Sequence, residues 1–174
     1  GGSRKATSWV VQDTSWSAFL ARLSQPVRTP ETFQEYKALP KPRQDDLKDV
    51  GGFVGGVLAG PRRKKDSAGE RHLVTLDADS IEPGGTQDVL NAVSGLGCAY
   101  AVYSTRKHEG AAPRLRVVVP LDEPCTAEEY EPIARKLASF LGIQMFDPTT
   151  FESVRLMYWP SCSADSEFVF LYGD

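Results

Sequence analysis

Cysteine and histidine are scarce in this sequence, which has three cysteines and two histidines among 174 residues. Cys98, Cys125 and Cys162 lie far apart, and no two of them have the spacing of a metal-binding or redox motif. This argues against a cysteine-held metal site and favours a reducing, cytoplasmic setting. The sequence also lacks an apolar run long enough to span a bilayer and lacks a signal peptide, so we expect no membrane partner.

A net positive charge is lacking as well, because 23 acidic residues outnumber 20 basic ones and give a charge of -3. This argues against a protein coated in basic charge, but a local basic groove depends on where the charges lie. The basic residues gather at 62–72 and 106–116, which taken alone are typical of solvated surface. The apolar content of 41% allows a full hydrophobic core, and the length suits one domain or two tightly joined modules.

The first part of the sequence, residues 1–65, predicts a small α/β module. Helix N-caps and helical spacing of apolar residues are the main signals, together with prolines and glycines that end the elements. The expected elements are a strand at 7–12, a helix after Ser15, a second helix after Thr32, a short charged helix at 44–48 and a glycine-interrupted strand at 51–58.

The second part, residues 66–174, has a clearer pattern. The expected elements are strands at 73–76, 98–103, 114–119 and 154–159, helices at 86–94 and from Thr126 to Gly142, and one more strand at 167–171. From residue 73 the β-α-β-β-α-β order is that of the RNA-recognition or ferredoxin-like split βαβ sheet, so the predicted fold class is α+β. In that topology the third and fourth strands flank the first and run antiparallel to it, and the second runs parallel to it.

This topology would bring three carboxylates to one end of the sheet. Asp77 and Asp79 are two positions apart in an extended segment, so their side chains share a face. Asp147 is the preferred third carboxylate because Pro148 holds it extended, and Glu152 is the alternative. Such oxygens suit two Mg²⁺ or Mn²⁺ ions, although an Asp-x-Asp after a strand is by itself more often a turn or a helix cap.

Two arginines are predicted to face these carboxylates. Arg114 and Arg116 alternate with Leu115 on a strand, and their planar guanidinium groups suit phosphate oxygens. Surface ion pairing with nearby acidic residues is the alternative for both. His108 could donate to a phosphate or transfer a proton, and an exposed loop histidine is an equal alternative.

The ordered set of motifs resembles the archaeo-eukaryotic primase superfamily. More closely, it is similar to primase-polymerase domains in replication proteins of phages, prophages and plasmids, which are often joined to a helicase. The motifs are LVTLDAD at 73–79, YSTRKH at 103–108, PRLRVVVPL at 113–121, FD at 146–147 and VRLMYWP at 154–160. A front segment at 30–53 is also similar, so the resemblance covers nearly the whole chain.

The resemblance implies a DNA primase/polymerase, a nucleotidyltransferase whose two metal ions are held by Asp77, Asp79 and Asp147. Its second motif implies triphosphate contacts from Ser104 and His108, but three residues separate them here in place of the usual one. The remaining candidates for phosphate binding are Arg106, Lys107, Arg114, Arg116 and Arg155. The implied partners are a single-stranded DNA template and primer, nucleoside triphosphates and a helicase domain in the full-length protein, in a bacterial host or phage-infected cell.

Other classes of function stay open at this point. A metal-dependent nuclease or nucleotide cyclase could use the same carboxylates, and a degenerate domain could only bind nucleotides. A non-catalytic nucleic-acid-binding module is a further alternative, against which the lack of aromatic-rich central strands argues. If the domain is catalytic, Asp77→Ala or Asp79→Ala should abolish synthesis and leave the fold intact.

Overall fold

A computed structural model describes residues 1–174. The centre of the fold is a five-stranded sheet. Its strands, in spatial order, are β3 (Gly56–Leu58), β4 (Ala68–Ala78), β6 (Leu115–Cys125), β5 (Tyr100–Ser104) and β9 (Phe170–Gly173). All neighbouring strands are antiparallel, so β4 and β5, which both pair with β6, run parallel to each other. The α+β class and the relation of the first three predicted strands are therefore confirmed.

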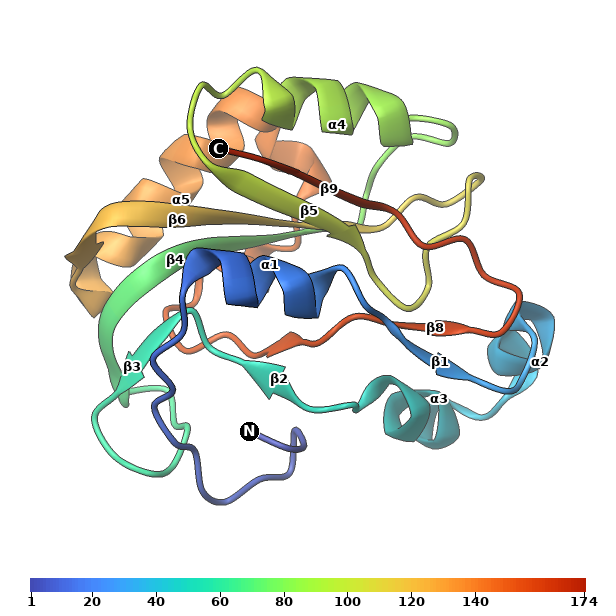
Figure 1. The fold of residues 1–174 in the computed structure, drawn as a ribbon, viewed down its shortest axis with the longest axis horizontal. Helices are drawn as coiled ribbons and strands as arrows, with labels where there is room; N and C mark the ends of the chain where they lie inside the picture. Colours follow the sequence, from blue (N-terminus) through green and yellow to red (C-terminus); the bar gives the residue numbers. More distant parts are fainter.

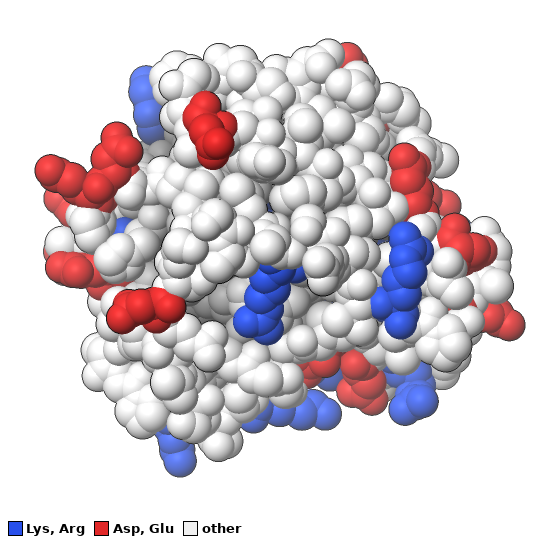
Figure 2. All heavy atoms as spheres, in the orientation of Figure 1, with Lys and Arg blue, Asp and Glu red and all other residues white.

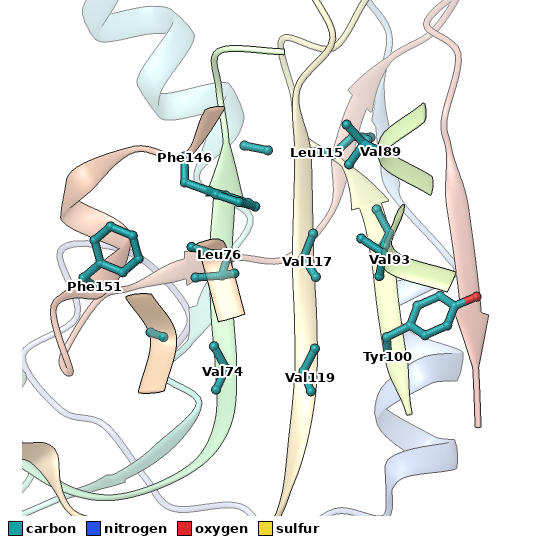
Figure 3. Close-up of a cluster of buried hydrophobic side chains, with 14 of the residues drawn as sticks. Val74, Leu76, Val89, Val93, Tyr100, Leu115, Val117, Val119, Phe146 and Phe151 are labelled. Atoms are coloured by element: carbon teal, nitrogen blue, oxygen red, sulfur yellow. The ribbon is translucent and has the colours of Figure 1, made fainter. Parts of the chain in front are cut away.

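Alternating side chains give the sheet two buried faces. Val117 and Val119 of β6 pack into the main core with helices α4 (Thr86–Ser94) and α5 (Ala127–Leu141), whereas Val118 faces a smaller core. Figure 3 shows the larger core, and Figure 1 shows α1 (Trp16–Leu23) on the opposite side of the sheet from α5. This two-sided pattern explains the apolar stretches at 73–76 in β4 and 117–121 in β6.

The helix ends follow the predicted capping signals. Thr126 and Glu129 form a capping box at the start of α5, and Gly142 ends it with a φ of 104°. Thr32 and Glu35 form a second capping box at the start of α2 (Phe33–Ala38). Both boxes satisfy backbone N–H groups that the first helical turn leaves unpaired, which fixes where each helix begins.

The N-terminal segment covers the face of the sheet opposite the main core, and two of its short strands pair with strands near the end of the chain. The short strand β1 (Val27–Thr29) runs parallel to β8 (Ser161–Ser163), and β2 (Gly52–Phe53) runs antiparallel to β7 (Met157–Tyr158). Helix α3 (Lys41–Lys48) precedes β2. The expected strand at 7–12 does not form, because this segment makes no ladder and Val10 and Val11 are exposed.

The predicted placement of the fourth strand is wrong. Only Met157–Tyr158 is extended there, and it pairs with β2 outside the main sheet. The free edge of β4 is instead occupied by β3, by a single bridge from Phe146 to Ala78, and by the 3-10 helix η2 (Pro148–Phe151), which follows η1 (Ile143–Met145). Asp147 is itself extended, as predicted, but its side chain caps the helical turn that begins at Pro148, so the chain curls directly after it.

Glycine makes the pairing of β3 with β4 possible. A Cβ atom on Gly56 would lie 2.2 Å from the carbonyl oxygen of Glu70, closer than any side chain tolerates. The glycine pair at 55–56 therefore serves a close approach between two strands. None of the helices in the structure has both the length and the apolar character that crossing a bilayer would require.

Candidate functional site

The three predicted carboxylates lie at one end of the sheet. Asp77 is the penultimate residue of β4 and pairs in register with Arg116 of β6, and Asp79 follows the strand. The backbone N–H of Asp147 donates to the carbonyl of Asp77 at 2.8 Å, and that of Asp79 donates to Met145 at 3.0 Å. Asp147 is therefore brought to the strand end by direct contact with the edge of β4.

Buried hydrogen bonds hold the turn that carries Asp147. Thr150 is fully buried, and its hydroxyl accepts from the backbone of Asp77 at 3.0 Å and donates to the carbonyl of Thr75 at 2.8 Å. The guanidinium of Arg71, also fully buried, donates to the carbonyl of Ser153 at 2.6 Å. Together these contacts fix both ends of the turn on β4.

Replacing Thr150 by valine should lower the free energy of unfolding by about 1–3 kcal/mol, because the buried N–H of Asp77 loses its acceptor while the side-chain volume stays similar. Chemical denaturation of the purified domain measures this change. Thr149→Val is the matched control, since Thr149 is less buried and its hydroxyl bonds only to Asp147. Equal stability of Thr150→Val and the wild type would show that the turn does not depend on this anchor.

Each carboxylate faces one arginine. Arg116 donates from Nε and Nη2 to the two carboxylate oxygens of Asp77, the latter at 3.1 Å. Nη1 of Arg114 lies 3.2 Å from Oδ2 of Asp79, and Nη2 of Arg155 lies 3.7 Å from Oδ2 of Asp147. Arg114 and Arg116 therefore face carboxylates as predicted, and Arg155 adds a third pair that the sequence did not predict.

The three pairs differ in their exposure to solvent. The side chains of Arg116 and Asp77 are only 6% and 11% exposed, whereas those of Asp79 and Asp147 are 37% and 28% exposed. Burial works to lower the pKa of Arg116, but the adjacent Asp77 charge raises it overall, so the buried guanidinium stays charged. Burial raises the pKa of Asp79, Arg114 opposes this, and the charges of Asp77 and Asp147 add to it.

These side chains fit a divalent cation in part. Asp79 and Asp147 offer partly exposed carboxylate oxygens, the ligand type that Mg²⁺ and Mn²⁺ prefer. Both oxygens of Asp77 are engaged by Arg116, and no group of three or more histidine, cysteine or acidic side chains is arranged to hold a metal ion. Asp77 is therefore less available as a ligand than Asp79 and Asp147, unless Arg116 releases it.

Two residues of the predicted second motif are turned toward the backbone. The hydroxyl of Ser104 accepts from the N–H of Val169 at 2.9 Å, and Nδ1 of His108 accepts from the N–H of Arg114 at 3.1 Å. Burial lowers the pKa of His108, with nearby acidic groups opposing it, which favours the neutral ring. His108 thus orders the loop that leads to Arg114, and its Nε2 remains free to donate.

The two basic residues of this motif lie in different surroundings. Arg106 is 4% exposed, pairs with Glu31 and lies 4.5 Å above the ring of Tyr36, while its Nε and Nη1 have no partner. Lys107 is half-exposed, and partial burial, with Lys41 and Arg114 nearby, lowers its pKa. Arg106 is therefore partly committed to the N-terminal segment.

The structure adds one basic residue that the sequence did not single out. Lys48, at the end of α3, lines a small cavity of about 20 Å³ together with Arg106 and Arg116. Burial lowers the pKa of Lys48, with Arg116 next in effect, and its Nζ lies 4.9 Å over the ring of Tyr158. A role for Lys48 could not be predicted from the sequence, because a lysine in a short charged helix is typical of solvated surface.

No continuous basic surface is visible on the face that Figure 2 shows. The Lys and Arg side chains in the middle of that face stand apart from one another. Three arginines are instead buried inside the fold, namely Arg71, Arg106 and Arg116. Of the three arginines that face the carboxylates, Arg116 is buried, whereas Arg114 and Arg155 are about one-third exposed.

The fold is similar to that of a solved structure, the AEP domain of the primase-polymerase of Cyanophage S-2L. The sequences are 12% identical, the match covers 89% of this chain and 86% of that one, and the TM-score is 0.51. Among curated protein sequences no match is found. A family model described as the VapE N-terminal domain matches residues 1–174. The chain therefore belongs to the VapE N-terminal domain family, and its fold is similar to that of an AEP domain.

Proposed function

We propose that the domain catalyses template-directed nucleotidyl transfer. The 3′-hydroxyl oxygen of a primer or of an initiating nucleotide attacks the α-phosphorus of a nucleoside triphosphate. The bond from that phosphorus to the bridging oxygen breaks, pyrophosphate leaves, and the hydroxyl proton passes to solvent. The observation that carries the proposal is the set of three carboxylates at one sheet end, each faced by an arginine, on an AEP-type fold.

Asp79 and Asp147 are the proposed ligands of Mg²⁺ or Mn²⁺, and Asp77 joins them when Arg116 moves away. When bound, such ions stabilise the attacking and leaving oxygens and offset the charge of the triphosphate. Positioning and electrostatics then supply most of the catalysis, and no covalent enzyme intermediate is needed.

The arginines are the proposed phosphate ligands. In the ligand-free domain Arg114, Arg116 and Arg155 neutralise the carboxylates, so neither set of charges is left unpaired. Triphosphate oxygens compete for the arginine N–H groups, and cations compete for the carboxylates. Because both exchanges keep every charge paired, we expect metal and triphosphate to bind more tightly together than separately.

Other basic groups extend this phosphate site. Lys48 and Arg106 line the small cavity beside Arg116 and are the nearest further donors. Lys107 and the Nε2 of His108 follow, whereas the Ser104 hydroxyl can take part only if it also keeps its bond to Val169.

The wider setting follows from the same proposal. The template and primer are single-stranded DNA segments, the full-length protein carries a helicase domain, and the domain acts in replication of a phage or mobile element in the bacterial cytoplasm. Residues 1–65 and 66–174 act as one catalytic unit, because β1, β2 and β3 all pair with strands from the second segment.

The test is incorporation of labelled nucleotides on single-stranded DNA, with and without a primer, in Mg²⁺ or Mn²⁺. Products whose length and sequence follow the template support the proposal, and chelation of the metal should remove them. Shortening of the DNA would instead indicate a nuclease, and a cyclic nucleotide would indicate a cyclase. Strand binding without any product, by protein shown to be folded, would indicate a binding module.

A further inference from the structure

A cavity of about 470 Å³ lies beside Asp79 and Asp147, between the end of β4, helix α5 and the turns after it. It shares no lining residue with the small basic cavity at Arg116. Its volume is within the range of roughly 300–1,000 Å³ that is usual for sites of small ligands. The two carboxylates therefore border an open space that none of the proposed phosphate ligands lines.

The walls of this cavity differ in chemistry. Asp79 and Asp147 form an acidic wall, and Phe146 and Phe151, which are 5% and 4% exposed, contribute apolar surface. Arg135 of α5 supplies the positive charge, with its guanidinium 4.3 Å from the centroid of the Phe151 ring. The cavity thus combines acceptor oxygens, an apolar surface and one cation.

Arg135 is available to a ligand. Its Nε donates to Glu131 at 2.8 Å, and its two Nη groups have no hydrogen-bond partner in the chain. The ion pair with Glu131 is about half exposed, so it contributes little to folding and exchanges readily. Ring stacking meanwhile holds the planar group in place, and its free Nη groups suit a phosphate.

The chemistry of the cavity lining distinguishes a nucleoside triphosphate from the 3′-terminal nucleotide of a strand. A triphosphate carries several negative charges, and the single arginine of this cavity cannot balance them even where cations on Asp79 and Asp147 offset part of that charge. A 3′-terminal nucleotide of a strand carries one phosphodiester, an apolar sugar and base surface, and a neutral hydroxyl that can donate to a carboxylate. Only the second ligand matches each wall with a group of the right kind.

We propose that this cavity holds the 3′-terminal nucleotide of the strand being extended, with its hydroxyl toward Asp79 and Asp147 and its last phosphodiester on Arg135. The assignment rests on the proposed nucleotidyl transfer. It places the two substrates on different sides of the carboxylates, with the attacking hydroxyl on the α5 side and the triphosphate on the side of Arg114 and Arg116.

The test compares Arg135→Glu with Lys136→Glu, which makes the same charge change one residue away, outside the cavity. Lys136 is exposed, and its ammonium lies over the exposed ring of Phe140. Fluorescence anisotropy measures the affinity for a labelled primer–template, and a second primer carries an uncharged methylphosphonate as its last linkage. We expect Arg135→Glu to weaken binding of the ordinary primer by roughly tenfold or more.

The uncharged primer isolates the contact with Arg135. The wild type and Lys136→Glu should bind the ordinary primer more tightly than the methylphosphonate primer, and Arg135→Glu should lose this preference. Equal losses in both variants, or a preference that survives in Arg135→Glu, would overturn the assignment. Thermal melting of each variant confirms that the domain is folded, and Arg135→Gln replaces Arg135→Glu if the latter is not.

Steady-state kinetics separate this assignment from the function on which it rests. In Arg135→Glu the KM for primer–template should rise while the KM for the nucleotide stays the same. A raised nucleotide KM with an unchanged primer KM would show that the cavity takes the triphosphate, and the assignment would fail although the polymerase activity stands. If the wild type incorporates nothing, the proposed function fails, and the binding data still show whether the cavity holds a strand end.

Discussion

Replacing Asp79 by asparagine is expected to lower nucleotide incorporation by about 100-fold or more, because a neutral amide no longer holds the cation that offsets several kcal/mol of transition-state charge. The fold should survive. The carboxylate is 37% exposed and its partner Arg114 is 36% exposed, so water can solvate the arginine after the change. Incorporation rates at saturating primer and nucleotide, together with thermal melting, measure both effects.

Asp122→Asn is the matched control for this experiment, since Asp122 is an exposed residue of β6 and forms no ion pair. Binding of Mn²⁺, followed by its paramagnetic resonance signal, adds a readout that does not depend on activity. Asp79→Asn should bind Mn²⁺ more weakly than the wild type and than Asp122→Asn. Wild-type incorporation and wild-type Mn²⁺ binding by Asp79→Asn would remove Asp79 from the site.

The buried pair of Asp77 and Arg116 should show the largest effect on stability. Replacing Arg116 by methionine is expected to lower the free energy of unfolding by about 3–5 kcal/mol, because it leaves the Asp77 carboxylate buried without a partner. Arg116 also donates to the Tyr103 hydroxyl at 3.0 Å and to the carbonyl of Tyr158 at 2.7 Å, and these acceptors would lose a donor. Denaturation in urea at neutral pH measures the change.

A double replacement, Asp77→Asn with Arg116→Met, tests the explanation. Because the unpaired charge is gone, the double variant should be more stable than the sum of the two single changes predicts. Additive effects of the two changes would show that water reaches both groups. A loss of less than about 1 kcal/mol for Arg116→Met would show the same, because exposed ion pairs contribute no more than that.

The burial of Asp77 beside Arg116 changes what we expect of Asp77→Ala. Two carboxylates placed side by side predict that Asp77→Ala relieves repulsion and leaves the fold intact. In the structure the nearest charge to Asp77 is the guanidinium of Arg116, so removal of Asp77 leaves a buried cation. Asp79 is therefore the better position for testing catalysis, and loss of activity in Asp77→Ala alone would not identify a metal ligand.

The sequence by itself determined the elements whose signals are local. Helices α4 and α5 are where apolar spacing, the Thr126 cap and the terminal glycines predict them. Alternation along a strand also predicted that Arg114 and Arg116 share one face. Short-range periodicity and capping encode such features directly, because only neighbouring residues decide them.

The tertiary structure decided the edges of the sheet and the partners of the charged groups. Residues 154–159 have a strand-like composition, but β3 and the turn at Thr150 take the edge of β4. Lys48 and Arg135 come to the carboxylate end from helices far apart in the sequence. Edge pairing and ion pairing depend on which distant segments are buried together, and that competition is settled only when the whole chain packs.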